Sequence, residues 1–198
     1  MSLFSTGSQE AAIYKRARLR ALWRATAEQA TAAANLPSWQ PGEHWLVKCA
    51  LSPTVAGAIA KYASELHPAR LWIATFAASP TTIENLQQIA GLTPELLLFS
   101  RILLSRGSQL LAAARDWAGP DRVMVARIHA KIAVLVEGDF ARTMAITGSA
   151  NLSKNAGYEL LALDSTPATA RWLVDQIHAM AADAELVEAS KRKKAIRR

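Results

Sequence analysis

The amino-acid sequence predicts an α/β fold, in which a central mixed sheet is flanked by helices and preceded by an N-terminal helix. The first observation is that periods typical of strands alternate with helical periods from residue 43 to residue 187. The second is a pair of apolar runs joined by EGDF, residues 137–140, which predicts a hairpin and therefore some antiparallel pairing. With 51% hydrophobic residues among 198, the chain can bury the core of one ordinary domain.

The N-terminal helix is predicted over residues 9–35, which are rich in alanine and contain neither glycine nor proline. The segment LPSWQPGE that follows carries two prolines and a glycine, which should end the helix. We therefore divide the chain into an N-terminal helical arm and linker (residues 1–40), an α/β domain (41–187) and a basic tail (188–198).

The domain itself should alternate strands and helices. Strands are predicted at residues 44–52, 70–79, 122–137, 141–149 and 158–165. Helices are predicted at 53–68, 80–91, 105–119 and 166–189, the first two beginning with a proline, which suits the first helical turn. The run at 95–104 is ambiguous between strand and helix.

The strand predicted at 122–137 carries polar side chains where a buried strand should have none. Because side chains alternate across a strand, its even positions form a fully apolar face that should pack under helices. The odd face is apolar at both ends but carries Arg127, His129 and Lys131 in its middle. This pattern favours a central strand, and its buried polar groups would then need partners.

The second strand of the hairpin and its loop offer such partners. Thr147, Ser149 and Asn151 share one face if the extended backbone persists through the loop. They would then approach His129 and Lys131 across the hairpin, and the combined groups could bind an oxyanion and carry out chemistry. Two simpler explanations stay open at this point: a structural histidine, and a helix N-cap at GSANLS.

An HxK pair, a short hairpin and a GSxN loop resemble the HKD motif of the phospholipase D superfamily, and the likeness extends over residues 127–161. The resemblance implies a phospholipase D-like α/β sandwich. It also implies a set of catalytic and phosphate-binding residues, namely His129, Lys131, Gly148, Ser149, Asn151 and Glu159. One position departs from the family pattern, because Val136 stands where the family usually has an aspartate.

The chain carries a single HxK pair, as do the small bacterial endonucleases of that superfamily. The resemblance implies a homodimer with one shared active site, in which His129 forms a phosphohistidine intermediate. It implies no metal and no cofactor.

The charge distribution favours nucleic acid as the partner. Of the 23 Lys and Arg residues six lie in the last eight positions, so the remainder, with 17 basic and 16 acidic residues, is nearly neutral. The predicted phosphate-contacting residues are Lys15, Arg16, Arg18, Arg20, Lys191, Arg192, Lys193, Lys194, Arg197 and Arg198. The alternative is that both runs are merely solvated. Trp39, in the linker, is expected in exposed packing or a dimer contact, with base stacking as the alternative.

Two rival functions remain at this stage. A lipid phosphodiesterase or phosphatidyl transferase would need two motifs and a membrane-binding surface, and neither is evident. A non-catalytic nucleic-acid-binding dimer of the same fold would explain Val136 but not the intact His129 and Lys131. With no secretory or membrane-spanning pattern and one cysteine, Cys49, we expect a cytoplasmic protein that binds no membrane.

Overall fold

A computed structural model describes residues 10–15, 22–26, 36–49, 55–102, 108–149 and 159–196, with the backbone alone described for 10–15, 22–26, 49, 108, 159 and 184–196. The described residues form one mixed sheet in the order β2-β1-β3-β9-β8-β7-β4-β5-β6. Its strands are β1 (Glu10–Lys15), β2 (Leu22–Thr26), β3 (His44–Cys49), β4 (Ala69–Thr75), β5 (Leu92–Ser100), β6 (Val123–Ala126), β7 (Lys131–Glu137), β8 (Arg142–Gly148) and β9 (Glu159–Asp164). The predicted α/β sandwich with a central mixed sheet is confirmed.

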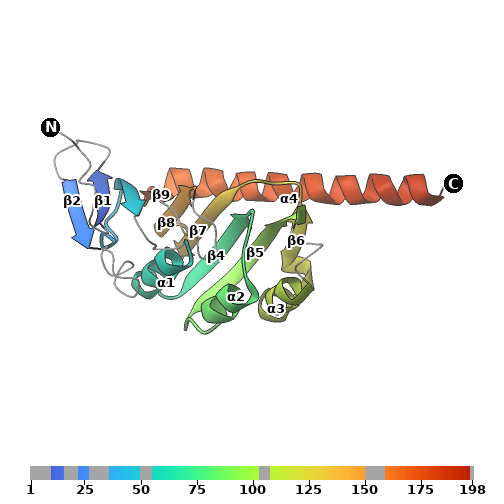
Figure 1. The fold of residues 1–198 in the computed structure, drawn as a ribbon, viewed down its shortest axis with the longest axis horizontal. Coiled ribbons are helices and arrows are strands. Elements are labelled where there is room, and N and C mark those ends of the chain that lie inside the picture. The colour runs from blue at the N-terminus through green and yellow to red at the C-terminus, as the bar shows by residue number, and fades with distance from the viewer. Residues whose placement is uncertain are drawn as a thin grey trace.

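Helices cover both faces of the sheet. They are α1 (Val55–Glu65), α2 (Pro80–Gln87), α3 (Ser108–Ala118) and α4 (Pro167–Ile196). Figure 1 shows α1, α2 and α3 side by side on one face, and α4 alone across the other. The ambiguous run at 95–104 lies mainly in β5, which pairs in parallel with β4 and β6.

Each face of the sheet has its own apolar cluster. The three-helix side joins residues such as Ile59, Ile83 and Leu110 to the sheet. On the other side, Ala170, Leu173, Val174, Ile177 and Ala181 of α4 recur at helical spacing and pack on the sheet. These two clusters pack the helices against the sheet, whose strand ends carry the predicted site residues.

The single strand predicted at 122–137 is wrong, because the chain divides there into β6 and β7. β6 is parallel to β5 at the edge of the sheet, whereas β7 is antiparallel to β4 near its centre. Residues 127–130 therefore cross the ends of β5 and β4. The alternation of apolar residues continues through this crossover, so the sequence pattern does not distinguish it from a continuous strand. The predicted faces are nevertheless confirmed, because the even positions 124–136 all contact the α4 cluster.

The N-terminal helix predicted over 9–35 is also wrong where the structure describes it. Residues 10–15 and 22–26 are the strands β1 and β2, and β1 pairs antiparallel with β3. Helix propensity differs by only about 0.7 kcal/mol per residue among ordinary residues. The unpaired backbone groups along β3 offer a row of hydrogen bonds that can outweigh this preference.

The C-terminal helix is longer than predicted. α4 continues to Ile196 instead of ending at 189, so most of the predicted basic tail is helical. Figure 1 shows this half of α4 projecting beyond β6. The division of the chain into three parts stays a prediction.

Trp39 belongs to the packing of the edge remote from the predicted site. Its indole nitrogen donates to the carbonyl of Thr143 at 2.8 Å, and the Arg142 guanidinium lies 4.4 Å from the ring centroid. Close by, Tyr62 donates to the carbonyl of Pro37, and burial together with the Glu65 carboxylate raises the pKa of this phenol. These contacts agree with the packing role expected of Trp39 rather than with base stacking.

Asp164 joins β3, β9 and α4 at this same edge. Its carboxylate accepts from the Thr166 backbone at 2.8 Å and the Thr169 hydroxyl at 2.9 Å, and lies 2.6 Å from Nδ1 of His44. We expect Asp164→Ala to lower the free energy of unfolding by about 1–2 kcal/mol, since the half-buried donors of Thr166 and Thr169 at the start of α4 lose their acceptor. Urea denaturation measures this loss. Asp175→Ala, on an exposed position of α4, is the control and should change stability little.

Candidate active site

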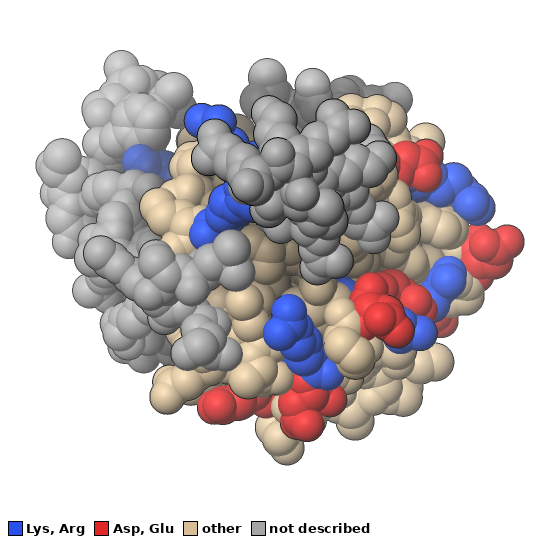
Figure 2. Space-filling model, turned by 90° about the vertical axis from the view of Figure 1, so that its right-hand side faces the viewer, with Lys and Arg blue, Asp and Glu red and all other residues tan. Residues whose placement is uncertain are grey.

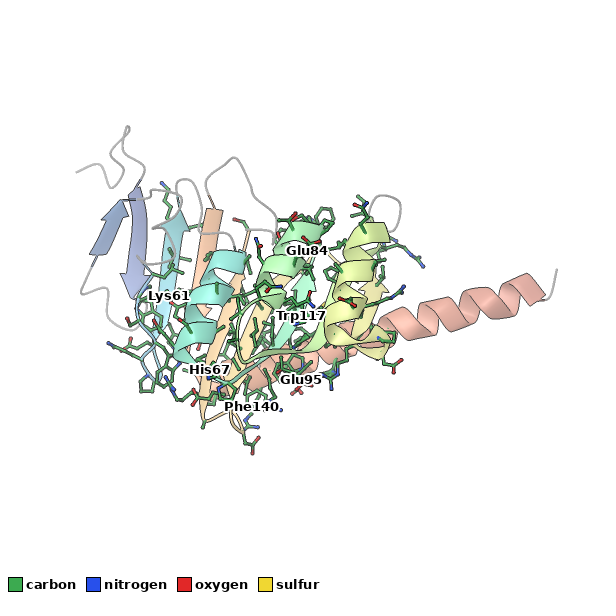
Figure 3. The ribbon with its side chains drawn as sticks, turned by 90° about the horizontal axis from the view of Figure 1, so that it is seen from below. Lys61, His67, Glu84, Glu95, Trp117 and Phe140 are labelled. Atoms are coloured by element: carbon green, nitrogen blue, oxygen red, sulfur yellow. The ribbon has the colours of Figure 1, made fainter. Side chains whose placement is uncertain are left out.

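The predicted site residues gather along one edge of the sheet, the edge formed by the ends of its strands. The parallel strands β4, β5 and β6 all end there, at Thr75, Ser100 and Ala126. β7 begins at this edge because Lys131 pairs with Thr75, and β8 ends there. The carboxyl ends of parallel strands are where open α/β sheets commonly bind ligands. The β7–β8 turn with Phe140 lies at the opposite end of these strands, as does His67, which precedes β4 (Figure 3).

His129 and Lys131 lie together at this edge. His129 is exposed on the crossover segment, and Lys131 is the first residue of β7. Nζ of Lys131 is 3.4 Å from Nδ1 of His129 and 3.4 Å from its carbonyl oxygen. An accessible imidazole with an ammonium at this distance can meet an anionic substrate and exchange a proton or form a bond with it.

Phe76 contacts both of these residues and was missed by the sequence analysis. Its ring centroid is 4.4 Å from that of His129, with an angle of 54° between the ring planes. Nζ of Lys131 lies 5.4 Å from the same centroid, within range of a cation–π interaction. The available signal was an aromatic residue within the predicted strand 70–79, directly after the threonine that ends the apolar stretch LWIA.

Gly148 and Ser149 extend the pairing between β8 and β9 to the same edge. The Ser149 backbone donates to the carbonyl of Leu160 at 3.0 Å, and its hydroxyl oxygen accepts from the Leu160 backbone at 3.1 Å. A Cβ at Gly148 would collide with the carbonyl oxygen of Leu160. The glycine of the GSxN loop is therefore required by the close approach of two backbones.

We expect Gly148→Ala to destabilise the protein by about 1–3 kcal/mol, because β8 and β9 must separate to admit the methyl group. The shift should also displace Ser149. Denaturation in urea measures the change in stability. Thr147→Ser, one residue earlier in β8, adds no atom and should cost much less; equal losses in the two variants would count against the steric explanation.

The predicted convergence of faces needs correction. Thr147 pairs with Ile132, so it shares the face of Ile132 under α4 and not the face of Lys131. Lys131 is brought level with Gly148 if that register is continued by one residue. Asn151 lies outside the described residues, and only the backbone of Glu159 is described, paired with Cys49 at the start of β9.

Val136 lies far from the site. It is buried in the α4 cluster, opposite Arg70 on β4 and Thr143 on β8. It is five positions along the strand from Lys131, or roughly 16 Å at the usual rise. The departure from the family pattern at this position therefore touches the core and not the reacting groups.

The basic residues predicted to contact nucleic acid lie at both ends of the chain. Lys15 ends the backbone of β1, and Lys191, Arg192, Lys193 and Lys194 lie on the projecting half of α4. Arg16, Arg18, Arg20, Arg197 and Arg198 lie outside the described residues. On the face drawn in Figure 2, described Lys and Arg residues alternate with Asp and Glu instead of forming one patch.

Within the described ranges, His, Cys, Asp and Glu form no group of three or more that could hold a metal ion. Among the helices of this part of the chain, none is both long and apolar enough to span a bilayer.

Comparison with known proteins finds similarity in structure alone. No family model and no curated protein matches the chain. A crystal structure of Nuc from Salmonella typhimurium, described as a phospholipase D family member, matches with a TM-score of 0.48 and 14% identity, over 70% of this chain and 94% of that one. NucT from Helicobacter pylori matches with a TM-score of 0.48 and 17% identity, over 70% and 96%.

Proposed function

We propose that this protein is a metal-independent phosphodiesterase that cleaves nucleic acid through a phosphohistidine intermediate. The observation that carries the proposal is the exposed imidazole of His129 with the Lys131 ammonium 3.4 Å from its Nδ1, at the strand-end edge where Ser149 also lies. The motif that contains these residues supports a phosphoryl group as the target. An imidazole and an ammonium together can bind a phosphodiester and attack it.

The proposed reaction has two steps, transfer of the phosphoryl group to His129 and its hydrolysis. In the first, a ring nitrogen of His129 attacks phosphorus, the bond to the leaving oxygen breaks, and His129 of the partner subunit protonates that oxygen. In the second, the partner's His129 takes a proton from water as the water oxygen attacks phosphorus. The bond between phosphorus and the first imidazole then breaks, which releases a phosphomonoester.

The remaining motif residues have supporting roles in this proposal. Lys131, Ser149 and Asn151 neutralise the phosphoryl oxygens, whose charge is greatest in the transition state. Glu159 holds the imidazole in the required tautomer, as triad carboxylates do. Gly148 allows the close backbone approach that places Ser149.

The proposed reaction requires a homodimer, because each chain supplies one HxK pair and two histidines act. Sedimentation of the purified protein should show a dimer at assay concentrations. A tenfold dilution that yields monomers should lower the activity per chain, whereas equal activity of the monomer would refute the shared site.

Nucleic acid is the proposed substrate because basic residues are concentrated at the two ends of the chain. Lys191 to Lys194 lie on a helix that projects beyond the sheet, where phosphates of a long polymer can be reached. Such contacts hold a backbone without reading its sequence.

The test is a cleavage assay with EDTA on single-stranded DNA, double-stranded DNA and RNA. We expect at least one polymer to be cut, with an end-labelled fragment joined to the protein through an acid-labile phosphorus–nitrogen bond after rapid quenching. Salt-sensitive binding without cleavage would favour a non-catalytic binding dimer. Turnover of phospholipid vesicles without cleavage of any nucleic acid would favour the lipid phosphodiesterase.

A further inference from the structure

Phe76 forms a common contact surface for the two reactive side chains of the candidate site. His129 and Lys131 are two residues apart, and both contact this ring. The His129 ring centroid is 4.4 Å from the Phe76 centroid, and Nζ of Lys131 is 5.4 Å from it. The direct contact between the two residues, at 3.4 Å, is long for a hydrogen bond. The Phe76 ring is therefore a contact that both side chains share.

The turn that carries Phe76 is itself fixed on both sides. Thr75 before it is buried, and its hydroxyl donates to the carbonyl of Ala77 at 3.0 Å. Ser79 after it is the N-cap of α2, and accepts from the Thr82 backbone at 3.2 Å. Phe76 consequently lies between a buried strand end and a capped helix, so the backbone that carries its ring is held on both sides.

His129, in contrast, lies on a segment with few backbone restraints. In the crossover at 127–130, the structure records a backbone hydrogen bond from Ile128 to Ala126 at 3.1 Å, which lies before the histidine. The residue is exposed. An aromatic contact restricts such a ring at little cost, because tilted ring pairs are favourable at this separation.

We propose that Phe76 is a positioning residue of the phosphodiesterase: its ring orients the His129 imidazole and restrains the Lys131 ammonium beside it. This inference rests on the function proposed above. Without the ring, the imidazole would sample orientations in which its nitrogen misses the phosphorus. Misplacement of a reacting group by about 1 Å can reduce a rate by up to about 100-fold.

The experiment compares Phe76→Leu, Phe76→Tyr and the control Phe140→Leu, the same change at the opposite edge of the sheet. We expect Phe76→Leu to lower kcat by about tenfold with little change in KM. Phe76→Tyr keeps the ring and should restore kcat to near the wild-type value. Phe140→Leu should leave kcat unchanged, which separates positioning from general loss of packing.

A second readout needs no substrate. Loss of the aromatic ring current in Phe76→Leu should shift the NMR signals of the His129 ring protons, assigned by their absence in His129→Gln. The signals of His44, His67 and His178 should stay in place. Unmoved His129 signals, or an unchanged kcat in Phe76→Leu, would overturn the positioning role. Wild-type protein that cleaves no polymer, while its His129 signals respond to Phe76→Leu, would refute the proposed function and leave the contact itself established.

Discussion

His129→Ala is expected to reduce kcat for nucleic-acid cleavage on the order of 10⁴-fold or more, the scale of loss when a nucleophile or its acid–base partner is removed. The exposed side chain makes no contribution to either apolar cluster, so the variant should fold normally. Both steps of the proposed reaction depend on His129, because one copy attacks phosphorus and the other transfers the proton. Initial rates with EDTA and circular dichroism of the same samples measure the two expectations.

The control for this variant is His178→Ala, which removes an exposed histidine from α4. It should leave the rate unchanged. The acid-labile phosphoryl adduct should be absent from His129→Ala and present in the control. Cleavage that survives in His129→Ala, or that is lost equally in both variants, would contradict the nucleophilic role. Binding should be retained in both, since the basic residues proposed to contact phosphates are unchanged.

The hairpin and its two apolar faces could be predicted because alternation is a local property. Val134 and Val136 face α4, and Ala133 and Leu135 face the other helices, as their positions required. The HxK pair was likewise visible in the sequence, since two polar residues in an apolar run stand out whatever the surrounding fold.

The structure differs from the sequence-based predictions where pairing between distant parts of the chain determines the secondary structure. Nothing local distinguishes the crossover at 127–130 from a continuing strand, because Ile128 and Ala130 keep the apolar alternation. The strand β1 depends on the free edge of β3, which is a property of the assembled sheet. Phe76 approaches His129 only because β4 and β7 are neighbours, although 52 residues lie between the two positions. Such a contact follows from strand order and cannot be inferred from spacing.

Val136→Asp, which introduces the residue that the HKD motif usually carries at this position, is expected to destabilise this protein by about 2–4 kcal/mol. Val136 is fully buried in the α4 cluster. The cation opposite it, Arg70, already donates to the carbonyl of Gly138 at 2.8 Å and stacks 5.3 Å from the centroid of Trp72. A carboxylate would have to draw Arg70 from these contacts or stay unpaired. Urea denaturation should show a lower midpoint with little change in slope.

The same variant separates two explanations of the valine at this position, one structural and one catalytic. If position 136 serves only the packing of the core, Val136→Asp should leave kcat per folded molecule unchanged. Val136→Thr, similar in shape but uncharged, should cost less stability than the aspartate variant. A rise in kcat on Val136→Asp would instead mean that the valine limits the chemistry. The position of Val136, one strand length from Lys131 and buried against α4, supports the structural explanation.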